Sequence, residues 1–106
     1  MNARAQEMFE SACKFLDVKA SDRREKSDVE IALMLLMKLP FRCQYKVMLV
    51  PSCCHALGGG QLVLRHDRSS HPDDQFEIEW ESIEEFPEVV SRAVVFVQTA
   101  GSKAVK

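Results

Sequence analysis

The stretch FEIEWESIEEFPEVV, residues 76–90, decides the fold, because within it the sequence changes from the pattern of a strand to the pattern of a helix start. Apolar residues alternate with glutamates from Phe76 to Glu81, which is the period of a strand with one face on a core and one in water. Ser82 and Glu85 then have the spacing of a capping box, and Pro87 falls in a first helical turn, where proline costs no hydrogen bond. The stretch therefore predicts a strand that leads directly into a helix.

The helix that starts here is expected to continue along an apolar stripe from Phe86 to Val97. The run AVVFV within it is rich in β-branched residues, which also suit a strand, but it lacks the alternation of a half-buried strand. A helix is therefore the predicted structure, followed by a frayed tail at about residues 100–106.

Two further strands are predicted upstream, CQYKVMLV at residues 43–50 and QLVLRH at residues 61–66. They are joined by the stretch PSCCHALGGG, residues 51–60, which is longer than a tight hairpin turn. Its glycines are expected to supply mobility and positive φ angles for the return of the chain.

Two helices are predicted before the strands. The first is amphipathic, with apolar residues at helical spacing from Ala5 to Leu16. The second should run from about Asp28 to Leu39, with a capping box formed by Ser27 and Glu30, and Pro40 should end it.

The resulting order, α-α-β-β-β-α, predicts an α+β fold in which a three-stranded antiparallel meander has its helices packed on one face. The chain of 106 residues fits a single domain, 1–106. In this arrangement the glutamates of residues 76–81 should point away from the helices.

The second helix has almost no polar face, and such a helix is normally covered on every side. It is either a central core helix or a helix that lies partly in a homodimer interface, since large exposed apolar patches are rare on monomers. The candidate interface residues are Ile31, Met34, Leu35 and Met37.

Acidic residues are concentrated between Asp73 and Arg92, although the net charge of the chain is only −2. Glutamates near a helix start and on a solvated strand have structural explanations. The functional alternative is an acidic surface for a basic partner protein. Its candidate residues are Glu77, Glu79, Glu81, Glu84 and Glu85.

Nucleic acid and membrane are not expected partners. Double-stranded RNA-binding domains share a similar order of elements, but they place lysines at the start of the final helix, where this chain has the acidic SIEEFPE. The longest apolar run, Ile31–Met37, is far shorter than the roughly 20 residues that span a bilayer. A cytoplasmic location is expected, in which the cysteines are reduced.

Cys53, Cys54 and His55 form the one cluster of chemically reactive residue types. They have no C-x-x-C spacing for zinc, no identifiable orienting acid for a thiol nucleophile, and no P-loop lysine after the glycines. Packing of two small residues at a strand end is therefore the favoured explanation of the cysteines.

These observations together favour a small non-enzymatic protein-interaction module of the adaptor or regulatory type. It is expected to be a homodimer, to use an acidic face for its partner, and to need no cofactor. The alternative is a small thiol- or metal-dependent protein that uses the loop of Cys53, Cys54 and His55.

Overall fold

The computed structural model describes residues 2–51, 58–66 and 75–104. The order of elements predicted from the sequence is confirmed. The elements are α1 (Ala3–Phe15), α2 (Ala20–Arg23), α3 (Asp28–Lys38), the 3-10 turn η1 (Leu39–Phe41), β1 (Tyr45–Pro51), β2 (Gly58–His66), β3 (Gln75–Ser82), the 3-10 turn η4 (Ile83–Glu85) and α4 (Phe86–Ala104).

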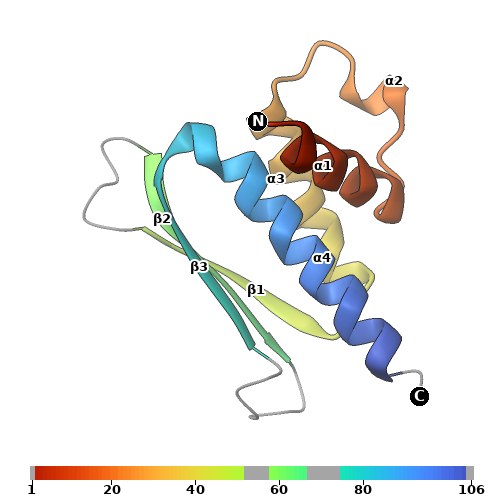
Figure 1. The fold of residues 1–106 in the computed structure, drawn as a ribbon, viewed down its shortest axis with the longest axis vertical. Helices are drawn as coiled ribbons and strands as arrows, with labels where there is room; N and C mark the ends of the chain where they lie inside the picture. The colour runs from red at the N-terminus through yellow and green to blue at the C-terminus, as the bar shows by residue number, and fades with distance from the viewer. Residues whose placement is uncertain (1, 52–57, 67–74, 105–106) are drawn as a thin grey trace.

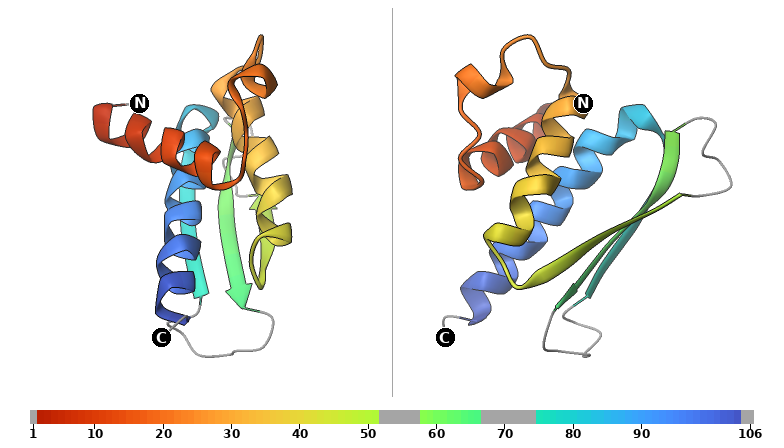
Figure 2. Two further views of the ribbon diagram at one scale, coloured as in Figure 1. Left: turned by 90° about the vertical axis from the view of Figure 1, so that its right-hand side faces the viewer. Right: turned by 180° about the vertical axis from the view of Figure 1, so that it is seen from behind.

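The elements form three layers (Figures 1 and 2). The sheet is one layer, α3 and α4 lie side by side on one of its faces, and α1 crosses over α4 on the side away from the sheet. The main core lies between the sheet and the two middle helices, and Leu35, Leu62 and Val94 are completely buried in it. The prediction that the helices pack on one face of the sheet is confirmed.

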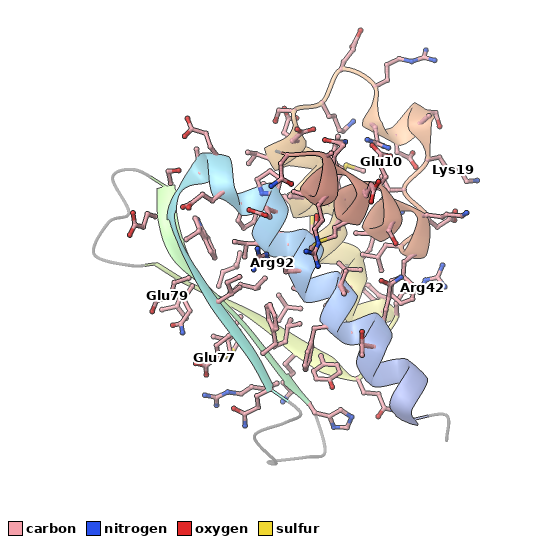
Figure 3. The ribbon with its side chains drawn as sticks, in the orientation of Figure 1. Glu10, Lys19, Arg42, Glu77, Glu79 and Arg92 are labelled. Atoms are coloured by element: carbon pink, nitrogen blue, oxygen red, sulfur yellow. The ribbon has the colours of Figure 1, made fainter. Side chains whose placement is uncertain are left out.

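The sheet is an antiparallel meander in the order β1–β2–β3. On β3, Phe76, Ile78 and Trp80 pack toward the helices, whereas Glu77 and Glu79 are exposed on the opposite face (Figure 3). The period-two pattern of this strand therefore gave the correct assignment of its two faces.

Gly59 and Gly60, near the start of β2, do not adopt the positive φ angles that the sequence predicts for them. Glycine is needed at these positions because neighbouring atoms leave no room for a side chain. A Cβ atom on Gly60 would lie 3.0 Å from Cζ2 of Trp80 and 2.9 Å from the carbonyl oxygen of Val50. A Cβ atom on Gly59 would lie 2.8 Å from the carbonyl oxygen of Glu81. The strand begins at Gly58, earlier than predicted, because these glycines let the backbones and the Trp80 indole approach closely.

Both predicted capping boxes are present. Ser27 Oγ accepts a hydrogen bond from the Glu30 amide at 3.2 Å, and α3 begins at the next residue after Ser27. Glu85 Oε2 accepts hydrogen bonds from the amides of Ser82 at 3.0 Å and Glu81 at 2.7 Å. Side-chain acceptors at these positions satisfy amides that a helix start leaves without partners.

The final helix, α4, contains Pro87 in its first turn and includes the run AVVFV, so residues 93–98 are helical as predicted. It extends to Ala104, so part of the predicted tail is also helical. Helical structure fits the run because Ala93, Val94 and Val97 are all buried on one side of α4.

The short helix α2 is an element that the sequence analysis does not predict. It is held to α1 by Arg23, whose guanidinium donates hydrogen bonds to both carboxylate oxygens of Glu10 at 2.6 and 2.7 Å. The same guanidinium lies 5.7 Å from the ring centre of Phe9. The hydrogen bonds from Arg23 lower the pKa of the Glu10 carboxyl.

Within the described part of the chain, no helix combines the length and the apolar character that crossing a bilayer requires.

Candidate interaction surface

The outward face of α3 carries a stripe of exposed apolar side chains. Leu33, Met37 and Phe41 are spaced four residues apart and therefore lie along one side of the helix and its 3-10 extension. Met37 is 73% exposed and Phe41 is 89% exposed. The side of α3 opposite to this stripe enters the core through residues such as Leu35 and Leu39.

The strand β1 adds a second group of exposed apolar residues. Met48 is 39% exposed, Leu49 is 49% exposed and Val50 is 41% exposed. Among the described residues, seven large hydrophobic side chains are exposed, and six of them lie between Leu33 and Val50. We call these six residues the 33–50 surface: Leu33, Met37, Phe41, Met48, Leu49 and Val50.

The two elements that carry the 33–50 surface lie on the same side of the molecule (Figure 2, right). In that view both α3 and β1 lie in front, with α4, β2 and β3 behind them. β1 is an edge strand of the sheet in the order β1–β2–β3. The sheet register places Met48 and Val50 in line with Glu77 and Glu79, on the face away from the helices, whereas Leu49 lies on the face that the helices cover. The 33–50 surface therefore has members on both sides of the β1 edge, and exposed sheet edges and exposed apolar groups are both places where other chains bind.

The charges along α3 and its extension are unequal at the two ends. Asp28 and Glu30 lie in the first turn of α3, and Lys38 lies in its last turn. Arg42 follows the 3-10 turn and is exposed. The apolar stripe is therefore bounded by acids at one end and by bases at the other.

The residues predicted from sequence for a dimer interface lie in different environments. Ile31 and Leu35 are 3% and 0% exposed, so they belong to the core of a single chain. Met34 is partly buried and packs against that core. Met37 alone of the four is largely exposed, and Leu33, which was not predicted, lies one helical turn before it on the same side.

The predicted acidic surface is exposed, but its members differ in role. Glu77, Glu79 and Glu81 lie on the outer face of β3, and Glu84 is exposed on η4. Glu85 caps the start of the final helical segment, and the hydrogen bonds from the Ser82 and Glu81 amides lower the pKa of its carboxyl. The structure therefore explains Glu85 as a capping residue.

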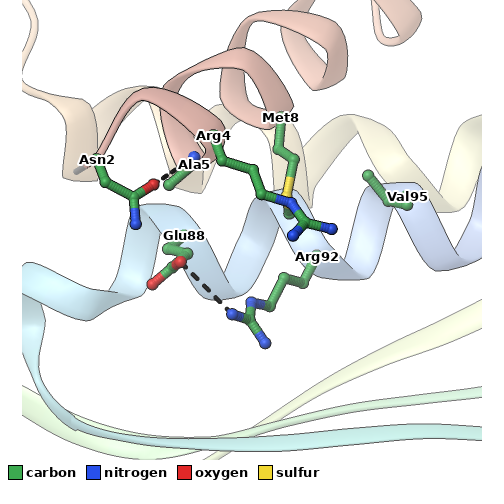
Figure 4. Close-up of a pocket in the computed structure, with 7 residues that line it drawn as sticks. All are labelled: Asn2, Arg4, Ala5, Met8, Glu88, Arg92 and Val95. Carbon is green, nitrogen blue, oxygen red and sulfur yellow. Dashed lines mark hydrogen bonds and ion pairs between the residues drawn. The ribbon is translucent and has the colours of Figure 1, made fainter.

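A pocket between α1 and α4 was not found by sequence reasoning (Figure 4). Its volume is about 480 Å³, and the side chains of Arg4 and Arg92 both extend into it beside Met8 and Val95. Glu88 lies 3.5 Å from Arg92 and partly neutralises it. No sequence signal connects Arg4 with Arg92, because only the packing of the first helix on the last one brings them together.

The predicted thiol or metal site, Cys53, Cys54 and His55, lies outside the described residues. In the part of the chain that is described, no three histidine, cysteine or acidic side chains come together as metal ligands. The buried thiol of Cys13 has its pKa raised, mainly by loss of solvation. Cys43 donates a hydrogen bond from Sγ to the carbonyl oxygen of Leu39 at 3.2 Å.

Comparison of this chain with protein-family models, with curated proteins and with solved structures finds no match.

Proposed function

We propose that this protein is a non-enzymatic protein-interaction module that works as a homodimer through its 33–50 surface. The observation that carries the proposal is the concentration of exposed apolar residues on α3, η1 and β1. Exposed apolar side chains that gather around one edge of a molecule mark a candidate interaction site. A cytoplasmic location belongs to the same proposal.

The energetic effect of one interface residue can be estimated from Met37. Complete burial of a methionine side chain contributes about 1.5–3 kcal/mol. A symmetric dimer contains this contact twice, so a polar replacement should cost about 3–6 kcal/mol. That loss corresponds to a weakening of dimerization by more than about 100-fold.

The experiment is native mass spectrometry combined with sedimentation over a range of concentrations, on protein purified without chelator. We expect a metal-free dimer for the natural chain and a monomer for Met37→Glu. Ile83→Glu, a similar change at an exposed hydrophobic residue outside the 33–50 surface, is the matched control and should leave the dimer intact. A natural chain that stays monomeric at all concentrations would refute the proposal.

The same spectra test the thiol or metal alternative, because they report bound mass as well as subunit number. Stoichiometric zinc that disappears in the double variant Cys53→Ser, Cys54→Ser would favour the alternative. A protein-interaction module should tolerate this double substitution with little effect.

The second candidate surface is the acidic face formed by Glu77, Glu79, Glu81 and Glu84. Its support is that all four carboxylates are exposed on the outer side of β3 and on η4. We propose that this face binds a basic partner protein. Reversal of Glu77 and Glu79 to lysine should abolish that binding, and binding that does not weaken as salt rises would contradict the proposal.

A further inference from the structure

We infer that two copies of the chain pair antiparallel through their β1 edges, so that the dimer contains one continuous six-stranded sheet. This inference rests on the proposed homodimer and specifies its geometry. It commits the 33–50 surface to one occupant, which is a second copy of this chain.

The first argument is topological. In the described part of the chain, β1 pairs with β2 alone and is an edge of the sheet. The outer edge of a strand presents backbone N–H and C=O groups that can pair with another strand. β1 has seven residues, so at about 3.3 Å per residue its edge is about 23 Å long. That length is sufficient for a ladder with a second β1 over residues 46–50, since Pro51 at the end of the strand has no N–H to donate.

The second argument compares the charges on the two edges of the sheet. β3, the opposite edge, carries Glu77, Glu79 and Glu81 on one face, and symmetric pairing of two β3 strands would place glutamates opposite one another. Like charges directly opposite each other destabilise a strand pair. β1 carries a single charge, Lys46, and pairing centred on Met48 places that lysine opposite Val50 of the second copy.

The third argument is charge complementarity along α3. A two-fold axis perpendicular to the sheet makes both strand pairs and helix pairs antiparallel. The acidic end of one α3, with Asp28 and Glu30, then lies beside the basic end of the other, with Lys38 and Arg42. The stripes of Leu33, Met37 and Phe41 can meet between these ends.

The symmetry also closes the assembly. A two-fold contact uses the same surface on both copies, so the β1 edges of both copies are paired with each other in one dimer. The remaining edges are the two β3 strands, whose glutamates oppose further edge-to-edge pairing. The expected product is a dimer and not a longer fibre.

The test is amide hydrogen exchange followed by NMR, with the natural chain at dimeric concentration and Met37→Glu as the monomeric reference. Within residues 46–50, the amides that do not bond to β2 should exchange at least 10-fold more slowly in the dimer. A dimer in which these amides exchange as fast as in the reference would overturn the inference and leave the proposed homodimer standing. A natural chain that is monomeric would overturn both.

A pair of lysine substitutions provides an independent readout. Met48→Lys adds a charge to the centre of β1 and should weaken dimerization at least 10-fold, whereas Glu79→Lys on the opposite edge should not weaken it. Circular dichroism at low concentration checks that both variants fold. Equal dimerization of Met48→Lys and the natural chain would contradict pairing through β1.

Discussion

Replacement of Gly60 by alanine tests the packing between β2 and β3. The added methyl group would lie 3.0 Å from Cζ2 of Trp80 and 2.9 Å from the carbonyl oxygen of Val50. The indole cannot retreat freely, because Trp80 is only 8% exposed and its ring centre lies 5.1 Å from that of Phe86. The backbone carbonyl is held in the β1–β2 ladder, so both neighbours resist displacement.

Two opposing effects set the size of the change in stability. Overpacking of a filled core costs about 1–3 kcal/mol. Alanine has less conformational entropy than glycine in the unfolded chain, and this difference alone would raise the free energy of unfolding by about 0.4–1 kcal/mol. The free energy of unfolding should therefore fall by about 1–2 kcal/mol, which corresponds to a drop in Tm of roughly 5–15 °C for a domain of this size.

The assay is urea unfolding of single and double variants, followed by circular dichroism. Trp80→Phe removes the ring atoms nearest to the new methyl group, so Gly60→Ala should cost less in that background, with a coupling of about 1 kcal/mol. Gln61→Ala, on the outer face of the same strand, is the control and should change stability by less than about 0.5 kcal/mol. The reasoning fails if Gly60→Ala is as stable as the natural chain, or if its cost is identical in both backgrounds.

Three further predictions concern the helices. Leu35→Ala should cost about 2–5 kcal/mol of unfolding free energy, whereas Leu33→Ala at monomeric concentration should cost less than about 1 kcal/mol, as urea titrations of both would show. Glu10 and Glu85 both have a lowered pKa in the folded chain, so their stabilising contributions are complete above the unfolded pKa near 4.3 and are lost as pH falls through the lower folded values. The double variant Glu10→Gln, Glu85→Gln should thus have a shallower loss of Tm between about pH 5 and 3; an unchanged slope would count against this explanation. The Cys13 thiol should react with a thiol reagent only at the rate of opening of the fold, and mass mapping of the adduct in native buffer would reveal a contrary, rapid reaction.

Much of the fold is predictable from sequence because its signals are local. The alternation in FEIEWE gives the strand and its faces, and the two capping boxes give the starts of α3 and the final helical segment. Each of these signals depends on residues within a few positions of one another, so their physical meaning does not depend on the rest of the chain.

The start of β2 is not predictable in the same way. Glycine is a weak strand former, and the reason for Gly59 and Gly60 is the position of Trp80, which is about twenty residues later in the chain. The glycines alone therefore suggest a loop, whereas the sheet register explains them as strand residues.

The orientation of α3 is also hidden from the sequence. An amphipathic helix shows its buried side through its polar residues, but Ile31 to Met37 offers no polar position. Only packing against α4 shows that Leu35 is inside and Met37 outside. For this reason the sequence names the helix as a whole for the interface hypothesis, and two of the four residues named for it are buried in the core.

The packing of α1 against α4 has a consequence for synthesis of the chain. Phe9 and Leu16, which are almost completely buried in the finished fold, are synthesised before α4, against which α1 packs. The 70 residues from 16 to 85 separate the two helices, and at about 5–20 residues per second they take about 4–14 s to make. During that interval α1 lacks the helix that covers it, so the nascent chain exposes the apolar side of α1 to chaperones until α4 has been translated.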